Sequence, residues 1–309
     1  MEIMTETVYE SLVIGGGPAG LSAALYLARY DRTVALFDTG RGRSSWHQIN
    51  HNYLGFPGGV PAKQLRELGR QQVAEYSQVT TLEYKIDRLE RQNGEFIAYG
   101  QAGEWRGKTV IICTGVIDHY PHFDGWEEYV GRSMFWCITC DGYGCRDARV
   151  VVVGNKNQAA SEALQLRRFT HQLTVLTDSS DCEIDEKFQR RLKQAGIPLV
   201  HDKIAEAIGK HGEFEALCTK SGERIELDQL FCQHGATPIA KLAEDVGVLL
   251  SRDGYICTDV EQKTNVAGVY AAGDVTRLHS HQITTAVHEG GMAASAANYY
   301  LYPDELKDD

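Results

Sequence analysis

The stretch Gly15-Gly16-Gly17-Pro18-Ala19-Gly20 decides the fold of this chain. A short apolar run at residues 9–14 precedes it, and a helical pattern of leucines follows it. Glycines 15, 17 and 20 fit G-x-G-x-x-G, in which the first makes a tight turn, the second lets a pyrophosphate approach the backbone, and the third lets the helix pack on the strand. Because strand, glycine turn and helix occur in this order, we predict a dinucleotide-binding unit rather than a plain turn.

The continuation of this unit supplies an acidic residue at the expected distance. A second predicted strand, residues 33–37, ends at Asp38, whose carboxylate is placed to accept hydrogen bonds from a ribose diol. A helix predicted over residues 61–76 then carries Lys63, Arg66 and Arg70 on one face. We expect this basic stripe to be a solvated helix face rather than a docking surface for an acidic partner.

A second motif, Cys137-Ile138-Thr139-Cys140-Asp141-Gly142, carries redox chemistry. Two cysteines at this spacing can close a small disulfide ring, and the following carboxylate can exchange a proton with the pair. Cys145 follows, so zinc or an iron–sulfur cluster is an alternative, as are inert buried thiols. A metal site normally needs four ligands at repeated spacing, and the chain has no second Cys-x-x-Cys, so we favour redox use and expect no metal.

Length and composition limit the class of protein. The chain has 309 residues, enough for two domains with separate cores, and 43% hydrophobic and 24% charged residues. A net charge of −11 argues against nucleic acid and anionic membranes as partners. The eight cysteines do not form a secreted disulfide framework, and residues 1–10 lack the features of a signal peptide. With no apolar segment of membrane-spanning length, we expect a cytoplasmic protein.

After the cysteine pair the strand–turn–helix pattern repeats in altered form. The three glycine positions are occupied by Gly154, Lys156 and Ala159, and lysine at the second places a long side chain where phosphates would lie. After the next strand, residues 177–181 offer no arginine for a 2′-phosphate, so NADP should bind poorly. Asp178 leaves open a second adenine dinucleotide with a free ribose diol, either NADH or FAD.

The remaining segments complete two α/β domains. Residues 79–105 alternate as in a β-meander or hairpin, and strands are expected at 110–113, 254–257 and 266–272. A long Ala-rich helix is expected over residues 282–302. The tyrosines near its end, at 299, 300 and 302, are either an amphipathic helix end or a shield for a flavin face. We consider a metal site at His279, His281 and His288 unfavoured, because histidines commonly only hydrogen-bond.

Together, residues 15–20, 137–142 and the motif Gly268-Val269-Tyr270-Ala271-Ala272-Gly273-Asp274 resemble the low-molecular-weight thioredoxin reductases over nearly the whole chain. The resemblance implies two Rossmann-like domains, each with a parallel sheet plus a small β-meander. It assigns residues 1–117 and 241–309 to a discontinuous FAD-binding domain. Residues 118–240 would form an inserted NAD(P)-binding-like domain that carries the Cys-x-x-Cys pair. The resemblance also implies a homodimer.

Position by position, the resemblance assigns roles to individual residues. Cys137 would be the exchanging thiol, Cys140 the flavin-side thiol and Asp141 the acid–base group. The expected FAD-binding residues are Gly15, Gly17, Pro18, Ala19, Gly20, Asp38, Ser44, Asn52, Thr114, Gly115, Gly273, Asp274, His281, Gln282 and Ile283. The chain departs from the family pattern at the second glycine set, at the missing arginine pair, and at His281, where arginine is usual.

The leading hypothesis is therefore an FAD-dependent disulfide oxidoreductase of thioredoxin reductase type. Its expected partner is a thioredoxin-like protein or a small disulfide, and its electron donor is expected to be something other than NADPH, such as ferredoxin. Three alternatives stay open at this point: an NADPH-dependent thioredoxin reductase, a flavin dithiol oxidase that uses oxygen, and a flavin-binding regulatory protein with an idle cysteine pair.

Overall fold

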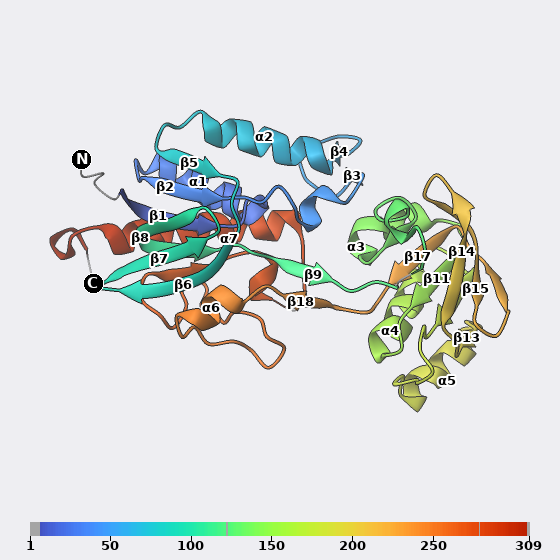
Figure 1. The fold of residues 1–309 in the computed structure, drawn as a ribbon. Coiled ribbons are helices and arrows are strands. Elements are labelled where there is room, and N and C mark those ends of the chain that lie inside the picture. The colour runs from blue at the N-terminus through green and yellow to red at the C-terminus, as the bar shows by residue number, and fades with distance from the viewer. Residues whose placement is uncertain (1–6, 122, 278, 308–309) are drawn as a thin grey trace. The chain divides into compact units, whose positions relative to one another are not determined.

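The computed structural model describes residues 7–121, 123–277 and 279–307, and these form two compact units. Unit 1 comprises Met1–Ser45, Ala62–Ile117 and Thr237–Asp309, and unit 2 comprises Trp46–Pro61 and Asp118–Ala236. The division predicted from the sequence differs from these units at two places. It placed residues 46–61 in the first domain and residues 237–240 in the second. Each unit has its own sheet and its own apolar core, and each is described separately below (Figure 1).

Unit 1 is built on a parallel sheet that continues into an antiparallel meander. The strand order is β5-β2-β1-β8-β7-β6, and β19 also pairs with β8. Strands β5, β2, β1, β8 and β19 pair in parallel with their neighbours in this group. Strands β7 and β6 then extend the sheet from β8 in antiparallel pairing. The strands are β1 (Val8–Ile14), β2 (Val34–Phe37), β5 (Val79–Leu82), β6 (Ile86–Gln92), β7 (Glu95–Gly100), β8 (Gly103–Ile112) and β19 (Val269–Ala271). Residues 79–82 thus belong to the parallel sheet, and the meander begins after them.

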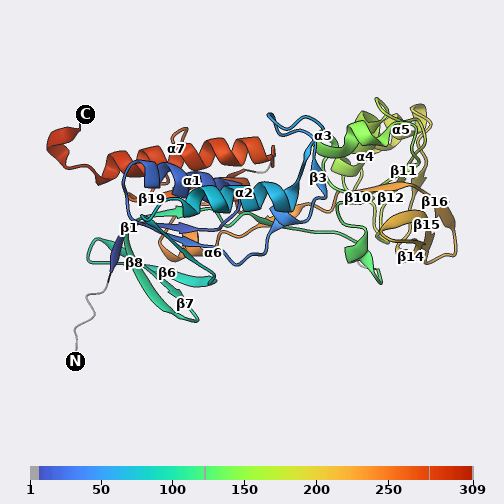
Figure 2. The same cartoon turned by 90° about the horizontal axis from the view of Figure 1, so that it is seen from above.

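Two apolar cores lie on opposite faces of this sheet. One face packs against helices α1 and α7, whose alanines and Leu27 are fully or almost fully buried. The other face packs against the meander and α6, with Leu89 and Phe96 at its centre. Figure 2 shows α1, α2 and α7 on one side of the sheet and β6, β7 and α6 on the other. The helices are α1 (Pro18–Arg29), α2 (Ala62–Ala74), α6 (Lys241–Asp245) and α7 (Ile283–Leu301), with short 3-10 turns at Arg43–Ser45, Asp274–Thr276 and Asp304–Leu306.

Unit 2 repeats the design with a parallel sheet of order β10-β17-β11-β12-β13. Its strand β11 is four valines, all buried, as expected for a strand covered on both faces. Helices α4 and α5 cover one face, and an antiparallel sheet of β14, β15 and β16 covers the other (Figure 2). The parallel strands are β10 (Met134–Phe135), β11 (Val150–Val153), β12 (Leu173–Leu176), β13 (Leu199–Val200) and β17 (Gln229–Cys232). The antiparallel strands are β14 (Ile204–Lys210), β15 (Glu213–Thr219) and β16 (Arg224–Glu226).

The remaining elements of unit 2 are short. Its helices are α3 (Ile138–Asp141), α4 (Asn157–Leu166) and α5 (Glu186–Gln194), with 3-10 turns at Trp126–Glu128 and Gly142–Cys145. Strands β3 (Ile49–Asn50) and β4 (Val60–Pro61) form a small antiparallel ribbon. Strands β9 (Val116–Asp118) and β18 (Ala236–Pro238) pair where the chain passes between the two units. The predicted class, two Rossmann-like domains with parallel sheets, is confirmed, and each unit carries a meander.

One expectation about an individual segment is wrong. Residues 254–257 do not form a strand: Ile256 makes only an isolated bridge with Leu250. The tyrosines at 299, 300 and 302 lie at the C-terminal end of α7, whereas His281 and Gln282 precede its first turn, about 28 Å away for a helix of this length. Tyr302 packs beneath the guanidinium of Arg32, at 4.8 Å. Both interpretations of these tyrosines, a helix end and a flavin shield, stay predictions.

Among the described residues, no helix has both the length and the apolar character needed to cross a bilayer. Residues 1–6, which form most of the N-terminal segment where no signal peptide is expected, lie outside the described residues.

Candidate active site

The first glycine turn is held by backbone contacts that exclude side chains at its first and third positions. Gly15 has φ +117°, and a Cβ on it would lie 2.2 Å from the carbonyl oxygen of Cys113. A Cβ on Gly20 would lie 1.7 Å from the carbonyl oxygen of Gly15. These two glycines therefore let β1, α1 and the end of β8 approach one another, which is the packing role expected of them.

The second glycine of the turn faces open space. A Cβ on Gly17 would meet nothing nearer than Ser44 Oγ, at 4.0 Å. Gly17 is also the N-cap of α1, with Pro18 and Ala19 in the first turn, and the described residues place no side-chain cap and no acidic group there. The free N–H groups at this helix end and the space in front of Gly17 fit the pyrophosphate of an FAD molecule.

Asp38 follows β2 and is almost fully buried, at 3% exposure. Arg66 Nη2 donates to both of its carboxylate oxygens, at 2.6 and 2.7 Å, and Arg66 Nη1 donates to the carbonyl of Gly40 at 2.7 Å. Gly16 makes room for this carboxylate, because a Cβ there would lie 2.2 Å from Asp38 Cγ. The expectation that the basic stripe on α2 is only a solvated face is wrong: Arg66 neutralises the buried acid, and Arg70 lies 3.7 Å from it.

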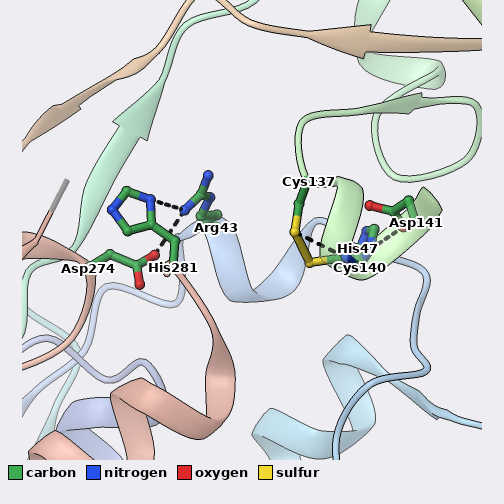
Figure 3. The surroundings of a disulfide bond; sticks show 7 residues. All are labelled: Arg43, His47, Cys137, Cys140, Asp141, Asp274 and His281. Carbon is green, nitrogen blue, oxygen red and sulfur yellow. Dashed lines mark hydrogen bonds and ion pairs between the residues drawn. A yellow bond between two sulfur atoms is a disulfide. The ribbon is translucent and has the colours of Figure 1, made fainter. Parts of the chain in front are cut away.

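A second polar group forms where β19 ends and α7 begins (Figure 3). Arg43 Nη1 donates to Asp274 Oδ2 at 3.0 Å and lies 2.8 Å from His281 Nδ1. The backbone N–H of Gly273 donates to Glu289, a glutamate of α7 that is 1% exposed. Asp274 is thus fixed by its neighbours beside the flavin-facing end predicted for α7. The family usually has arginine at the position of His281. In this chain Arg43, on a different segment, supplies a guanidinium at this place.

The other expected cofactor residues of unit 1 lie near the same ends of the sheet. Gln282 is the N-cap of α7, and Ile283 begins the helix. Thr114 Oγ1 donates to the carbonyl of Ile239 at 2.6 Å, and Gly115 adopts φ +71° beside it. Asn52 is exposed in segment 46–61 of unit 2 and stays a prediction as a flavin neighbour.

The cysteine pair of unit 2 forms a disulfide at the start of α3. Cys137 and Cys140 are bonded, and Cys137 is the N-cap of the helix, with its Sγ accepting from the backbone N–H of Cys140 at 3.1 Å. Cys145 is separate from this pair: its buried thiol donates to Gln229 Oε1 at 2.8 Å. Burial is the main cause that raises the pKa of Cys145 to about 12, so it stays a thiol.

The acid that follows the pair has a histidine neighbour. Asp141 Oδ1 lies 2.9 Å from His47 Nε2, and both side chains are mostly buried (Figure 3). The His47 ring also stands edge-on to Phe135, with ring centroids 6.0 Å apart. Burial raises the pKa of Asp141 to about 8, so its carboxyl group holds a proton at neutral pH. A protonated carboxyl beside a disulfide is what a proton donor to a released thiolate requires.

The second glycine turn carries charged and polar side chains. Lys156 forms a parallel bridge with Glu183, and its Nζ lies 3.9 Å from that carboxylate. Asn157, the first residue of α4, donates to Asp185 Oδ2 at 2.6 Å and accepts from the backbone N–H of Asp185 at 2.8 Å. Two carboxylates therefore lie at the helix end where a pyrophosphate would bind, and their charge opposes an anion there.

Asp178, the candidate residue for binding a second ribose, also has partners within the chain. Its Oδ1 accepts from the backbone N–H of Ile204 at 2.9 Å, and its Oδ2 lies 3.5 Å from His234 Nε2. Its backbone has φ +49°. This carboxylate ties the end of β12 to β14.

Comparison with known proteins assigns the class. The chain belongs to the pyridine nucleotide-disulphide oxidoreductase family, which matches residues 9–290. Thioredoxin reductase of Peptoclostridium litorale is 31% identical over 312 residues, which cover 96% of this chain and 98% of that protein. The crystal structure of thioredoxin reductase from Streptococcus pyogenes MGAS5005 matches with TM-score 0.89 and 26% identity, covering 96% and 99% of the two chains. The atypical thioredoxin reductase TRi from Desulfovibrio vulgaris Hildenborough matches with TM-score 0.54 and 32% identity, covering 95% and 98%.

These likenesses and the fold define a flavin-dependent disulfide oxidoreductase of thioredoxin reductase type. The family implies FAD, and the open space at Gly17 and the uncapped start of α1 fit it.

Sequence reasoning missed four side chains: Arg43, His47 and Arg66 contact expected site residues, and Glu162 contacts Ile138, the residue after Cys137. Arg66 carried a signal, since it lies on the face of α2 that the periodicity singled out. The other three carried none, because each meets its partner through tertiary packing between distant segments.

Proposed function

We propose that this protein exchanges two electrons between FAD in unit 1 and the Cys137–Cys140 disulfide in unit 2, and from there with the disulfide of a thioredoxin-like partner. The observation that carries the proposal is the disulfide itself, closed at the N-terminus of α3 with a buried carboxyl directly after it. Bound FAD supplies the two-electron chemistry. A homodimer and a discontinuous FAD domain over residues 1–117 and 241–309 belong to the same proposal, by family likeness.

The proposed reaction gives separate roles to the residues that hold FAD and to the residues that exchange electrons and protons. Gly17 and the start of α1 bind the pyrophosphate, and Asp274, oriented by Arg43, takes the ribityl side. Cys137 forms the mixed disulfide with the partner, and Cys140 is the thiol that exchanges electrons with the flavin. Asp141 gives a proton to the sulfur that is released and recovers it when the disulfide closes.

We further propose that the electron donor is not NADPH. Lys156 stands at the second glycine position of the central turn, and Glu183 and Asp185 place negative charge beside it. The same contacts, with Asp178 engaged elsewhere, speak against NADH or a second FAD in this unit. A protein donor such as ferredoxin would not need this turn.

Anaerobic reduction of the flavin tests the donor proposal. One equivalent of NADPH should leave the flavin absorbance near 450 nm unchanged over minutes, because lysine at the second glycine position and two carboxylates at the central turn disfavour binding of the dinucleotide phosphates. Dithiothreitol, which needs only the cysteine pair, should bleach the same sample. Rapid bleaching by stoichiometric NADPH would contradict the proposal and favour an ordinary NADPH-linked enzyme.

Replacing Asp141 with asparagine should slow disulfide exchange about a hundredfold at pH 7, the usual contribution of a positioned proton donor. Because burial raises the pKa of Asp141 to about 8, the wild-type rate should fall as pH rises through that value, and the variant should lose this transition. Exchange with a thioredoxin disulfide, followed across pH 6–10, measures both. Asp147→Asn, which removes an exposed aspartate nearby, is the matched control.

The same group should affect stability in a defined direction. The pKa of Asp141 is raised from its ordinary value of 3.8 to about 8 in the folded chain, so between these values the folded state binds more protons than the unfolded state. The free energy of unfolding of the wild type should therefore fall relative to Asp141→Asn as pH rises from 4 to 8. Denaturant unfolding at several pH values measures it, and a difference independent of pH would contradict the assignment.

A further inference from the structure

Beside the cysteine pair lies a second buried carboxyl group, on α4, that the proposed exchange does not use. Glu162 occupies the helix between Ala159 and Ala163, two residues that are fully buried in the core of unit 2. Its carboxylate accepts a hydrogen bond from the backbone N–H of Ile138. Ile138 directly follows Cys137, so this contact attaches Glu162 to the loop that the disulfide closes.

One of the two oxygens of this carboxylate lacks a hydrogen-bond partner among the described residues. This oxygen, Oε1, is buried. A buried carboxylate oxygen without a partner is costly when ionised, and the group avoids that cost by holding a proton. Burial accordingly raises the pKa of Glu162 to about 7, and the Ile138 N–H opposes this only in part.

The titratable and charged groups around Glu162 lie on α3 and α5 and at Cys145. Asp141 on α3 and Glu162 both act on the buried thiol of Cys145, which places the two carboxyls around the same thiol. The strands beneath α4, β11 and β12, contribute no charged side chain. The charged residues of α5, which also packs against α4, are all exposed; they are Glu186, Lys187, Arg190, Arg191 and Lys193.

We propose that Glu162 is the proton-coupled partner of the cysteine pair, taking up a proton when the disulfide is reduced and releasing it when the disulfide re-forms. Two electrons from the flavin break the S–S bond and leave one thiol and one thiolate, with one proton bound to sulfur. The new negative charge disfavours an ionised neighbour, so Glu162 binds a second proton from solvent. On oxidation by the partner disulfide, both protons leave with the two electrons. Glu162 is a positioning residue, because it acts through Ile138 and by its charge.

The consequence is a measurable effect on the reactivity of the exchanging thiol. An ionised Glu162 raises the pKa of a nearby thiol, so a neutral side chain of the same shape should increase the thiolate fraction at neutral pH. Glutamine keeps the carbonyl oxygen that accepts from Ile138. In a Cys140→Ser background, Glu162→Gln should therefore raise the rate of Cys137 alkylation by iodoacetamide at pH 7 by about threefold or more. The midpoint of the pH profile should move down.

The experiment uses the full-length flavoprotein, with alkylation of Cys137 followed by mass spectrometry of its peptide. Glu186→Gln removes an exposed glutamate of α5 and should leave the profile unchanged. Glu162→Asp keeps the charge and should keep the wild-type profile. This second variant gives a result even if Glu162→Gln folds poorly. A Glu162→Gln profile that superposes on the wild type, or an equal shift in Glu186→Gln, overturns the inference.

The inference rests on the proposed role of the Cys137–Cys140 pair, but the two fail separately. Alkylation of Cys137 needs neither a donor nor turnover. Full turnover in Cys140→Ser would overturn the proposed function without altering the alkylation profiles. Unaltered profiles in Glu162→Gln would overturn only the inference.

Discussion

Replacing Cys140 with serine should slow the reduction of the bound flavin by dithiothreitol about a thousandfold or more. The dithiol reaches the flavin only through disulfide exchange with the Cys137–Cys140 pair, and serine cannot form that bond. The flavin should stay bound with an unchanged spectrum, because the glycine turn and nearly all other residues expected to hold FAD lie in unit 1. Anaerobic stopped-flow absorbance measures the rate.

A control separates this effect from general loss of a thiol. Cys257→Ser removes an exposed free cysteine of unit 1 and should leave the rate unchanged. If Cys140→Ser retains the wild-type rate, the pair is idle, and the protein would be a flavin-binding protein without disulfide exchange.

Replacing Gly17 with alanine should leave the fold intact and lower the affinity for FAD about a hundredfold, or about 3 kcal/mol. The added Cβ meets no protein atom within 4 Å other than Ser44 Oγ at 4.0 Å, so the chain accommodates it. The same methyl group fills the space that the pyrophosphate needs in front of α1. Titration of the flavin-free protein with FAD, by quenching of flavin fluorescence, measures the affinity.

Substitutions at two further glycines serve as comparisons for this result. In Gly20→Ala the Cβ would lie 1.7 Å from the carbonyl oxygen of Gly15, so this variant should unfold more easily even without FAD. Gly144→Ala, in open space in unit 2, should affect neither stability nor affinity. Wild-type FAD affinity in Gly17→Ala would show that the first glycine turn does not hold the cofactor.

The parts of the structure that the sequence predicted are those set by local chemistry. The glycine turn at 15–20 follows from backbone clashes within the turn and with its adjoining strand, and these depend on residue type and spacing. The four-valine run of β11 and the alanine-rich α7 have the periodicity of their elements. The wrong strand at 254–257 was a short apolar run, and pairing decides whether such a run becomes a strand.

The parts that escaped prediction are set by packing between distant segments. Arg66, on α2, reaches Asp38, the residue after β2, across 28 residues of sequence. His47 meets Asp141 only because segment 46–61 folds with unit 2. Lys156 was expected to obstruct phosphates, but the positions of Glu183 and Asp185 beside its turn required the structure. Single-sequence patterns hold no information on these pairs.

The central claim is that a flavin and one disulfide of this chain share electrons. Anaerobic titration with dithionite counts those electrons, and denaturation of the same sample counts the FAD released. We predict that full reduction consumes about one equivalent of dithionite per chain more than the released FAD accounts for, and that this excess disappears in Cys137→Ser. Uptake equal to that of the flavin alone in the wild type, or a protein that binds no flavin, would contradict the account.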